Sequence, residues 1–333
     1  MRAMVMAAGL GTRLRPITYE IPKPVVPVCN RPIVEHLARL LAAHGVDELV
    51  ANLHWFPDTV KAALGDGSEL GVGVSYEFEE RLLGTAGGVR NVSSFLTEPG
   101  EDFLVLAGDA LTDVDLTKLM AAHRTNGGVA TLAVKKVSDV SEYGVIVVDG
   151  EGRIQGFQEK PDPAEALSDL VNCMVYAFSP EVFDYFPGEP GEEIDFALDV
   201  FPRLLELDVP FHVHEIDSYW NDVGTLREYV QGNLDAVSGA VRVEPLGELI
   251  EGERSLEGGV EVIGPVLIAE DAEIGAGSWL KGPAIVGPGA RIGAESRVAE
   301  AVLLPGAGIP PGGIFARGLA GDAQALLSGL KIV

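Results

Sequence analysis

The chain has 333 residues, more than one compact core usually holds, so we expect two domains. Its 50 acidic and 24 basic residues give a formal net charge of −26, which excludes binding to nucleic acid or to an anionic membrane through the overall field. Any anion site must therefore be built locally. Two cysteines without metal-like spacing, and no signal-like or membrane-spanning run, favour a cytoplasmic protein.

The first 238 residues alternate apolar runs with amphipathic patterns. Strands are predicted at 3–9, 48–54, 102–109 and 129–137, and helices at 33–46, 58–67 and 115–125. This alternation predicts a Rossmann-like α/β domain with a mainly parallel, mixed sheet flanked by helices. Ligands of such sheets bind beyond the carboxyl ends of the strands, where Gly9 and Asp109 are expected to lie.

A six-residue repeat begins near residue 250. Aliphatic residues occupy ten positions in register: Ile250, Leu256, Val262, Ile268, Ile274, Leu280, Val286, Ile292, Val298 and Leu304. A Gly/Pro-rich linker does not account for this register, whereas a parallel β-helix does, and the pattern resembles the left-handed β-helix of hexapeptide-repeat proteins.

We therefore expect an α/β domain over 1–238, a linker over 239–249, the β-helix over 250–318 and a C-terminal helix or tail over 319–333. Stacked coils expose an open end and flat faces, so a homo-oligomer, either a dimer or a tetramer, is expected.

A glycine-rich turn follows the first predicted strand in "MAAGLGTRLRP" (6–16). It is not a complete dinucleotide fingerprint, because Leu14 stands at the third glycine position, and it lacks the lysine of a Walker loop. Its backbone amides are nevertheless available to phosphate. The cations Arg13, Arg15 and Lys23 follow closely, so we expect them to converge on a triphosphate or pyrophosphate.

The longer stretch "GLGTRLRPITYEIPKPVVPV" (9–28) resembles the signature of the sugar-nucleotide pyrophosphorylases, which are nucleoside-triphosphate:sugar-1-phosphate nucleotidylyltransferases. The resemblance extends over the whole chain, because some branches of that family carry a C-terminal hexapeptide β-helix. It implies that Arg13 and Lys23 are catalytic and stabilise the departing pyrophosphate. It also implies that Asp109 and Asp222 hold Mg²⁺, a cation that prefers one or two carboxylates together with phosphate and water oxygens.

A second group of motifs resembles the sugar-phosphate site of that family. "GFQEKP" (156–161) carries the lysine that would hold the sugar phosphate as a third catalytic cation, and "VNCMVYAF" (171–178) carries an asparagine that would bind the sugar. The residues so assigned are Gly144, Glu159, Lys160 and Asn172. Cys173 and Met174 depart from the alanine and glycine that the family more often has there.

The segment "FEERLLGTAGGVRN" (78–91) resembles the part of the family that frames the nucleobase. We expect a flexible turn over Gly84–Gly88 that enters a helix, and "GTAG" is most similar to the GDP-mannose pyrophosphorylase (mannose-1-phosphate guanylyltransferase) branch. Glu79 could accept hydrogen bonds from guanine N1–H and N2–H, or be a solvated strand residue. The predicted nucleotide-binding residues are Ala8, Gly9, Leu10, Gly11, Thr12, Arg13, Glu79, Gly84, Thr85, Ala86 and Gly108.

The reaction expected from the resemblance joins GTP and mannose 1-phosphate to GDP-mannose and pyrophosphate, by Mg²⁺-dependent attack on the α-phosphorus. A thymidylyl-, uridylyl- or adenylyltransferase acting on glucose 1-phosphate or another sugar phosphate stays open. A catalytically silent regulatory subunit is less favoured, because all five charged residues assigned to catalysis or metal are present. An acyltransferase in the β-helix is disfavoured too, because residues 240–333 contain no histidine.

Overall fold

The computed structural model describes residues 1–98 and 100–321. The chain divides into two compact units. Residues 1–9, 37–110 and 114–220 form the first unit, and residues 10–36, 111–113 and 221 onward belong to the second. The predicted domain 1–238 is therefore shared between them.

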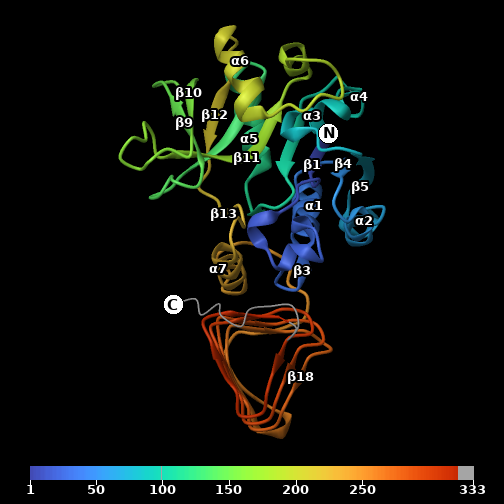
Figure 1. Ribbon diagram of the computed structural model, residues 1–333, viewed down its shortest axis with the longest axis vertical. Coiled ribbons are helices and arrows are strands. Elements are labelled where there is room, and N and C mark those ends of the chain that lie inside the picture. The colour runs from blue at the N-terminus through green and yellow to red at the C-terminus, as the bar shows by residue number, and fades with distance from the viewer. Residues whose placement is uncertain (99, 322–333) are drawn as a thin grey trace. The chain divides into compact units, whose positions relative to one another are not determined.

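The first unit contains a mixed sheet, which in the described residues has nine strands and the path β10-β9-β11-β6-β1-β4-β5, with β8 between β11 and β12 (Figure 1). The strands are β1 (Arg2–Met6), β4 (Glu48–Leu53), β5 (Gly73–Phe78), β6 (Phe103–Ala107), β8 (Ala130–Lys136), β9 (Gly144–Val148), β10 (Ile154–Glu159), β11 (Leu170–Phe178) and β12 (His212–Glu215). The predicted strands near 3–9, 48–54, 102–109 and 129–137 are confirmed as β1, β4, β6 and β8.

The prediction of a mainly parallel sheet was wrong, because half of the strand pairs in this sheet are antiparallel. Strands β6, β1, β4 and β5 are mutually parallel, as are β8 and β12. Strand β11 instead runs antiparallel to β6, β8 and β9, and β9 runs antiparallel to β10. The residues after 138 turn back without a crossover helix, and antiparallel pairing is the result.

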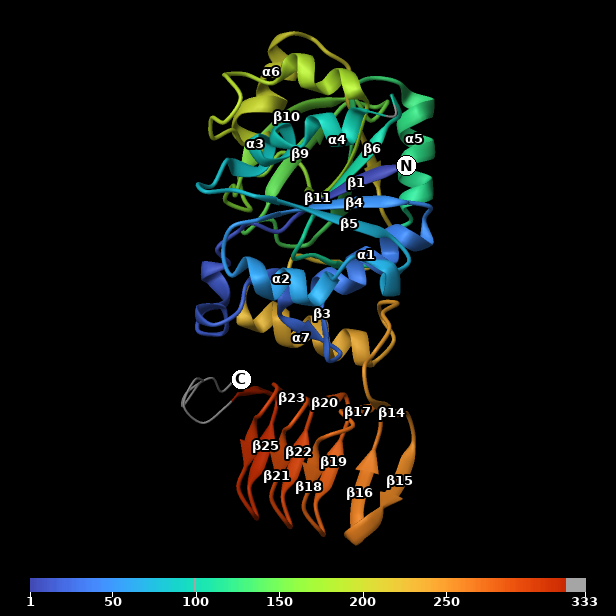
Figure 2. The same ribbon diagram turned by 90° about the vertical axis from the view of Figure 1, so that its right-hand side faces the viewer.

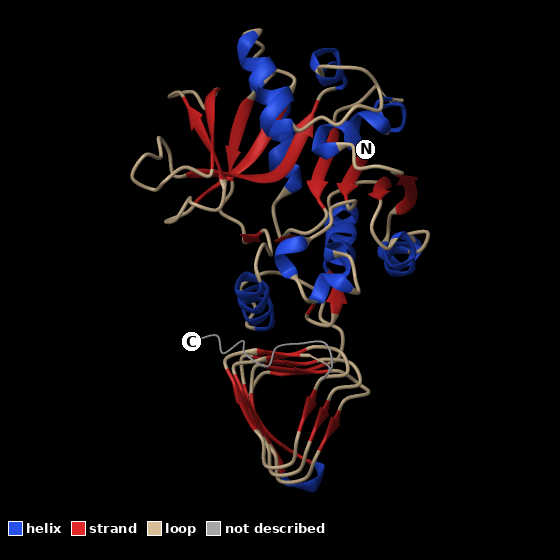
Figure 3. Ribbon diagram, viewed as in Figure 1, coloured by secondary structure: helices blue, strands red, loops and turns tan. Residues whose placement is uncertain are grey.

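Helices cover both faces of this sheet, with α3 and α4 on one face and α2 on the other (Figures 2 and 3). The helices assigned wholly to this unit are α2 (Pro57–Leu64), α3 (Gly84–Asn91), α4 (Ser93–Thr97), α5 (Leu116–Asn126) and α6 (Phe201–Glu206), while α1 (Ile33–Ala43) crosses the division between the units. Asp115 caps α5 by accepting from Lys118 N at 3.0 Å. The helix expected after the turn at 84–88 is present, but the turn itself was wrong, because α3 already begins at Gly84.

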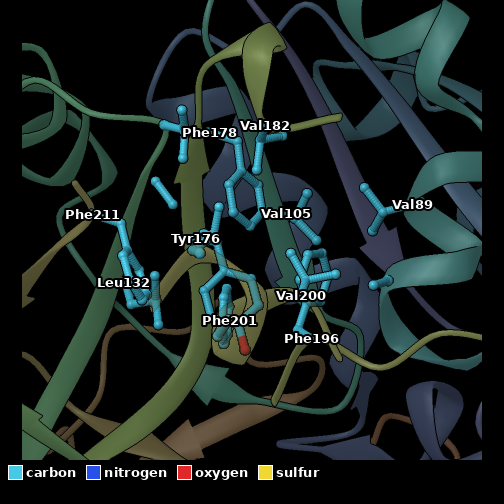
Figure 4. Close-up of a cluster of buried hydrophobic side chains, with 14 of the residues drawn as sticks. Val89, Val105, Leu132, Tyr176, Phe178, Val182, Phe196, Val200, Phe201 and Phe211 are labelled. Carbon is cyan, nitrogen blue, oxygen red and sulfur yellow. The ribbon is translucent and has the colours of Figure 1, made fainter. Parts of the chain in front are cut away.

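An aromatic cluster fills the space beneath β11 (Figure 4). Tyr176 and Phe178 of β11 pack against Phe196 and Phe201, and the rings of Phe178 and Phe196 stack at 5.3 Å between centroids. Such aromatic pairs add about 0.5–1.5 kcal/mol to the burial of their surface. The cluster gives β11, which carries Asn172, a rigid support.

The second unit begins with the glycine-loop segment and the short strands β2 (Pro27–Val28) and β3 (Arg31–Pro32). Helix α7 (Leu226–Val237) packs on them: Tyr229 donates its hydroxyl to Pro27 O at 2.6 Å, and Asn233 Oδ1 accepts from Cys29 N at 3.1 Å. Strands β7 (Leu111–Thr112) and β13 (Trp220–Asn221) lie where the chain passes from one unit to the other.

Residues 248–320 form what we call the C-terminal sheets, whose strands stack side by side along three sides (Figures 1 and 2). Their orders are β14-β17-β20-β23-β26, β15-β16-β19-β22-β25 and β18-β21-β24. The strands are β14 (Glu248–Ile250), β15 (Glu253–Leu256), β16 (Val260–Ile263), β17 (Val266–Ile268), β18 (Glu273–Ile274), β19 (Trp279–Lys281), β20 (Ala284–Val286), β21 (Arg291–Ile292), β22 (Arg297–Ala299), β23 (Val302–Leu303), β24 (Gly308–Ile309), β25 (Ile314–Ala316) and β26 (Leu319–Ala320).

The six-residue pattern matches the interior of these sheets. Val262, Leu280 and Val298 lie in register on neighbouring parallel strands and are buried. The first two repeats differ, because β14 and β15 pair antiparallel with β17 and β16. At the other end, β26 lies inside the range expected to be a tail, and the rest of that tail, 322–333, falls outside the described residues.

Within the described part of the chain, no helix combines the length and apolarity needed to cross a membrane.

Candidate active site

The glycine-rich loop leaves β1 at the carboxyl edge of the first unit's sheet. Ala7 and Ala8 are buried, whereas a Cβ built on Gly9 would meet no atom within 4 Å. Strand β6 ends beside β1, and Gly108 donates its N–H to Met6 O at 2.9 Å. A Cβ on Gly108 would lie 2.7 Å from the same oxygen, so the backbone here requires glycine. Gly9 and Asp109 thus follow adjacent parallel strands, as the sequence predicted.

In the second unit, the loop continues through a left-handed turn at Gly11, whose φ is +59°. A Cβ at Gly11 would lie 2.8 Å from Lys23 Cβ, so the absence of a side chain allows the lysine to pack against the loop. Thr18 Oγ1 fastens the loop by donating to Gly11 O at 2.8 Å.

Two cations of this segment meet at Asp222. Lys23, only 6% exposed, donates from Nζ to Asp222 O at 2.8 Å, and Arg13 Nη2 lies 3.7 Å from Asp222 Oδ2. Arg15 was expected to join them, but its guanidinium lies over the Tyr19 ring at 4.9 Å from the centroid. Arg13 and Lys23 therefore both approach Asp222, and Arg15 makes a cation–π contact with Tyr19.

The loop that carries Asp222 is tightly built. Gly224 donates its N–H to Asp222 Oδ1 at 3.2 Å, and a Cβ at Gly224 would lie 2.8 Å from Asp222 Oδ2 and 2.9 Å from Arg13 Nη1. Glycine at 224 therefore leaves room for the Arg13–Asp222 pair. No group of three or more metal-type side chains occurs in the described residues, so a cation held by Asp109 or Asp222 would complete its shell with substrate and water oxygens.

The predicted sugar-phosphate residues lie on strands β9, β10 and β11 of the first unit. Gly144 begins β9 and is paired with Glu159, the last residue of β10. A Cβ at Gly144 would lie 3.3 Å from Glu159 Oε2. Lys160 follows with a positive φ of +44°, donates its N–H to Tyr143 O at 3.1 Å, and places Nζ 3.7 Å from Glu159 Oε1. Lys160 and Glu159 are both half exposed, so this ammonium is accessible to an anion.

Asn172 lies where β11 bulges away from β8. Its Oδ1 accepts from Met174 N at 2.9 Å, and its Nδ2 donates to the Tyr176 hydroxyl at 2.9 Å. Burial raises the pKa of Tyr176, so this hydroxyl stays protonated. Met174 has a φ of +53°, a conformation that favours glycine, which explains why the family more often has glycine at this position.

The side chains and backbone of the predicted nucleobase segment make more hydrogen bonds within the protein than expected. Glu79 is 3% exposed, so the solvated alternative was wrong. Its Oε1 accepts from Asn52 Nδ2 at 2.7 Å and its Oε2 from Leu83 N at 3.1 Å, which occupies both oxygens that were expected to read guanine. Asn52 was missed by sequence analysis, because nothing in its strand pattern distinguishes it from a core residue.

The first turn of α3 also makes hydrogen bonds within the protein. Thr85 Oγ1 donates to Asp195 Oδ2 at 2.8 Å and accepts from Phe196 N at 2.9 Å. The N–H of Ala86 donates to Ile194 O at 2.9 Å, and Gly84, with φ +74°, passes so close to that carbonyl that a Cβ would lie 2.4 Å from it. Nothing in the sequence indicated the bond between Thr85 and Asp195, because the two residues are 110 positions apart in the chain.

Comparisons with known proteins identify the family of this chain. The model of the nucleotidyl transferase family matches residues 2–239. The chain is 36% identical to a UTP–glucose-1-phosphate uridylyltransferase of Synechocystis sp., covering 84% of this chain and 81% of that protein. It is 35% identical to the mannose-1-phosphate guanylyltransferase of Mycobacterium tuberculosis, covering 84% and 78%.

The solved structures agree on the fold. A putative glucose-1-phosphate thymidylyltransferase from Bacillus anthracis superposes with a TM-score of 0.64 at 23% identity, over 74% of this chain and 98% of its own. HddC from Yersinia pseudotuberculosis gives a TM-score of 0.60 at 23% identity, over 70% and 97%. The family match over most of the chain, together with the two curated relatives, shows that this protein belongs to the sugar-nucleotide pyrophosphorylases, the sugar-1-phosphate nucleotidyltransferases of the nucleotidyl transferase family.

Proposed function

We propose that this protein transfers the guanylyl group of GTP to mannose 1-phosphate, giving GDP-mannose and pyrophosphate. The gathering of Arg13 and Lys23 on the Asp222 loop carries the nucleotidyl-transfer part of the proposal, because a chain with a net charge of −26 otherwise repels a triphosphate. The "GTAG" segment and the guanylyltransferase from M. tuberculosis support guanine and mannose.

The second unit supplies the groups assigned to the leaving pyrophosphate. Arg13 and Lys23 stabilise the negative charge that grows on the β- and γ-phosphates as the bond to the α-phosphorus breaks. Lys23 is fixed by its bond to Asp222 O, so its ammonium is in place before the substrate arrives. Such preorganised donors lower the barrier because they do not reorganise during the reaction.

The carboxylates assigned to Mg²⁺ are Asp109 and Asp222, and their hard oxygen atoms fit this cation. Asp109 lies two residues beyond the end of β6, and the Asp222 carboxylate is oriented by Gly224 N–H at 3.2 Å. When bound, the cation would neutralise charge on the α-phosphate and on the incoming phosphate.

The first unit supplies the groups assigned to the sugar phosphate. Lys160 binds the phosphate of the nucleophile, and Glu159 and Asn172 bind sugar hydroxyls. The sugar phosphate oxygen is already ionised at neutral pH, so its attack on the α-phosphorus needs no general base. Positioning and charge neutralisation then account for most of the rate.

The loop from Ala8 to Arg13 is assigned to the triphosphate, with Gly108 allowing close approach at the end of the neighbouring strand. Gly84, Thr85 and Ala86 frame the base by the shape of α3, because the Thr85 hydroxyl and the Ala86 N–H are used by Asp195 and Ile194. We no longer assign guanine recognition to the Glu79 carboxylate, since it is only 3% exposed and both of its oxygens accept protein hydrogen bonds.

A second candidate activity is uridylyl transfer from UTP to glucose 1-phosphate. The relative from Synechocystis, at 36% identity, favours it. The two candidates share the chemistry and differ only in base and sugar.

We also propose that the C-terminal sheets form a left-handed β-helix of hexapeptide repeats that assembles the protein into a homo-oligomer. Parallel strands of neighbouring turns pair 17 or 18 residues apart, such as Val266 with Ala284 and Arg297 with Ile314, which is about three hexapeptides per turn. The mass of the protein in solution by light scattering tests the assembly, and a monomer at micromolar concentration would contradict it.

The activity is tested by pyrophosphate release with Mg²⁺ over a grid of ATP, GTP, CTP, UTP and dTTP against mannose 1-phosphate and glucose 1-phosphate. The proposal predicts that GTP with mannose 1-phosphate is the most active pair. A maximum at UTP with glucose 1-phosphate would establish the second candidate. The Lys23→Met variant serves as the inactive control. A folded wild-type protein that releases no more pyrophosphate than this control in any pair would refute nucleotidyl transfer.

A further inference from the structure

Three hydrogen bonds connect the strands that lead into the glycine loop and the nucleobase segment. Ala7 donates its N–H to Asn52 Oδ1 at 2.7 Å, Asn52 Nδ2 donates to Glu79 Oε1 at 2.7 Å, and Leu83 donates its N–H to Glu79 Oε2 at 3.1 Å. Asn52 is 4% exposed and Glu79 3%. We call this chain of hydrogen bonds the buried relay. It lies entirely within the first unit.

The relay crosses the sheet at its carboxyl edge. Strands β1, β4 and β5 are adjacent and parallel, with Met6 opposite Asn52 and Leu53 opposite Phe78. Ala7 and Glu79 are therefore the first residues beyond their strands, and Asn52 stands between them. The side chains continue the hydrogen bonding between the strands just where the backbone ladder ends.

Both ends of the relay touch segments assigned to the nucleotide. Ala7 immediately precedes Ala8 and Gly9 of the glycine loop, and Leu83 is the residue before α3 begins at Gly84. Helix α3 also rests on the relay: a Cβ at Gly88 would lie 2.7 Å from Glu79 Oε1 and 2.8 Å from Asn52 Nδ2. The relay therefore sets the spacing between the loop and the start of α3.

The direction of each hydrogen bond in the relay is fixed. The N–H groups of Ala7 and Leu83 can only donate, so Asn52 must turn its oxygen to Ala7 and its amide nitrogen to Glu79. Glu79 must then accept at both oxygens, which a carboxylate does and a glutamine does not. A buried carboxylate is costly unless hydrogen bonds satisfy it, and here donors on both sides do so.

We propose that Asn52 and Glu79 are positioning residues that hold the glycine loop and the start of α3 at the separation required by a nucleoside triphosphate. This inference rests on the proposed function and deepens it. It assigns no contact with the substrate to either side chain. Their effect reaches the nucleotide through Ala8, Gly9 and the first turn of α3.

The directionality supplies a test by rescue. Glu79→Gln places an NH₂ against either Asn52 Nδ2 or Leu83 N–H, and Asn52→Asp places a carboxylate against a carboxylate. The double variant Asn52→Asp/Glu79→Gln restores every bond, because the aspartate accepts from Ala7 and from the new amide, whose oxygen accepts from Leu83. The matched control is Glu77→Gln, which lies on β5 and is bonded to Asn91 of α3 but not to the relay.

The measurements are thermal unfolding, binding of each nucleoside triphosphate by calorimetry, and KM for both substrates. Each single variant is expected to weaken nucleotide binding and raise its KM roughly tenfold to a hundredfold, because one buried donor or acceptor loses its partner. The KM for the sugar phosphate should change less than threefold, and the double variant should recover most of the loss. The control should behave as the wild type.

Single variants with a lowered unfolding temperature but unchanged nucleotide binding would overturn the inference and leave the proposed function intact. Failure of the double variant to recover binding, although it unfolds at the wild-type temperature, would also overturn it. A wild type that binds no nucleoside triphosphate would refute the proposed function and the inference together.

Discussion

The open space beside Gly9 provides a sharp test of the glycine loop. A Cβ at Gly9 meets no atom within 4 Å, and its φ is not in the left-handed region, so the fold itself does not require glycine there. Alanine at this position should leave the unfolding free energy unchanged or raise it by about 0.4–1 kcal/mol, because it restricts the unfolded chain. The same methyl group should enter the space reserved for the triphosphate.

The expected effect on binding follows from overpacking. An extra methyl group in a filled site costs about 1–3 kcal/mol, which is roughly a tenfold to hundredfold rise in the KM for GTP. The assay combines urea unfolding with pyrophosphate release for Gly9→Ala and two comparisons. Gly150→Ala, also in open space, should have the same effect on stability as Gly9→Ala but leave the KM for GTP unchanged, and Gly108→Ala should lower stability, because its Cβ would lie 2.7 Å from Met6 O.

An unchanged KM in a stable Gly9→Ala protein would refute the assignment of this loop to the triphosphate. Loss of stability in that variant would refute the structural premise.

Three further predictions follow from particular side chains. Lys23→Met should lower kcat/KM by about 100- to 1,000-fold, whereas Arg15→Met, which removes a guanidinium lying over Tyr19, should lower it less than tenfold; equal losses would contradict the assignment. Burial lowers the pKa of His123 from its ordinary value of 6.5, so the unfolded chain is protonated first and the unfolding free energy should fall as the pH drops below 6.5. In urea unfolding at pH 7.5 and 5.5, His123→Gln should lose less stability over this interval than the wild type, and an identical loss would show that another group is responsible. Burial raises the pKa of Cys29 to about 12 and also raises that of Cys173, so a colorimetric thiol reagent should label neither cysteine in the folded protein and both in urea; rapid labelling without urea would disprove their burial.

Local patterns predicted the elements well. The apolar run at 102–109 became β6 (Phe103–Ala107), and the amphipathic pattern at 115–125 became α5 (Leu116–Asn126). Burial of one face or of both faces of an element leaves a periodicity that can be read without knowing its partners. The six-residue register over the C-terminal sheets could be read for the same reason, because neighbouring parallel strands bury equivalent positions, such as Val262, Leu280 and Val298.

Partners remote in the chain could not be read in this way. The antiparallel pairing of β11 with β6 joins segments about 70 residues apart, and Thr85 finds its support at Asp195. Asn52 and Glu79 read as an ordinary strand residue and an ordinary acidic residue. Their burial against each other depends on the parallel pairing of β4 with β5, which places the ends of the two strands side by side.

The site residues show the same limit. The sequence motifs brought Arg13 and Lys23 together correctly, because both lie on one short segment. They did not predict the contact of Arg15 with Tyr19, since it depends on how the chain turns after Leu14. They also did not predict the two groups that donate hydrogen bonds to Glu79, because Asn52 lies on another strand and Leu83 directly precedes a helix.

The measurement that tests the central claim most directly is the fate of phosphorus label from GTP in the presence of mannose 1-phosphate and Mg²⁺. Attack on the α-phosphorus predicts that label from the α-position appears in GDP-mannose and that label from the γ-position appears in pyrophosphate. Transfer of γ-label to the sugar phosphate, or its release as orthophosphate, would contradict nucleotidyl transfer by this protein.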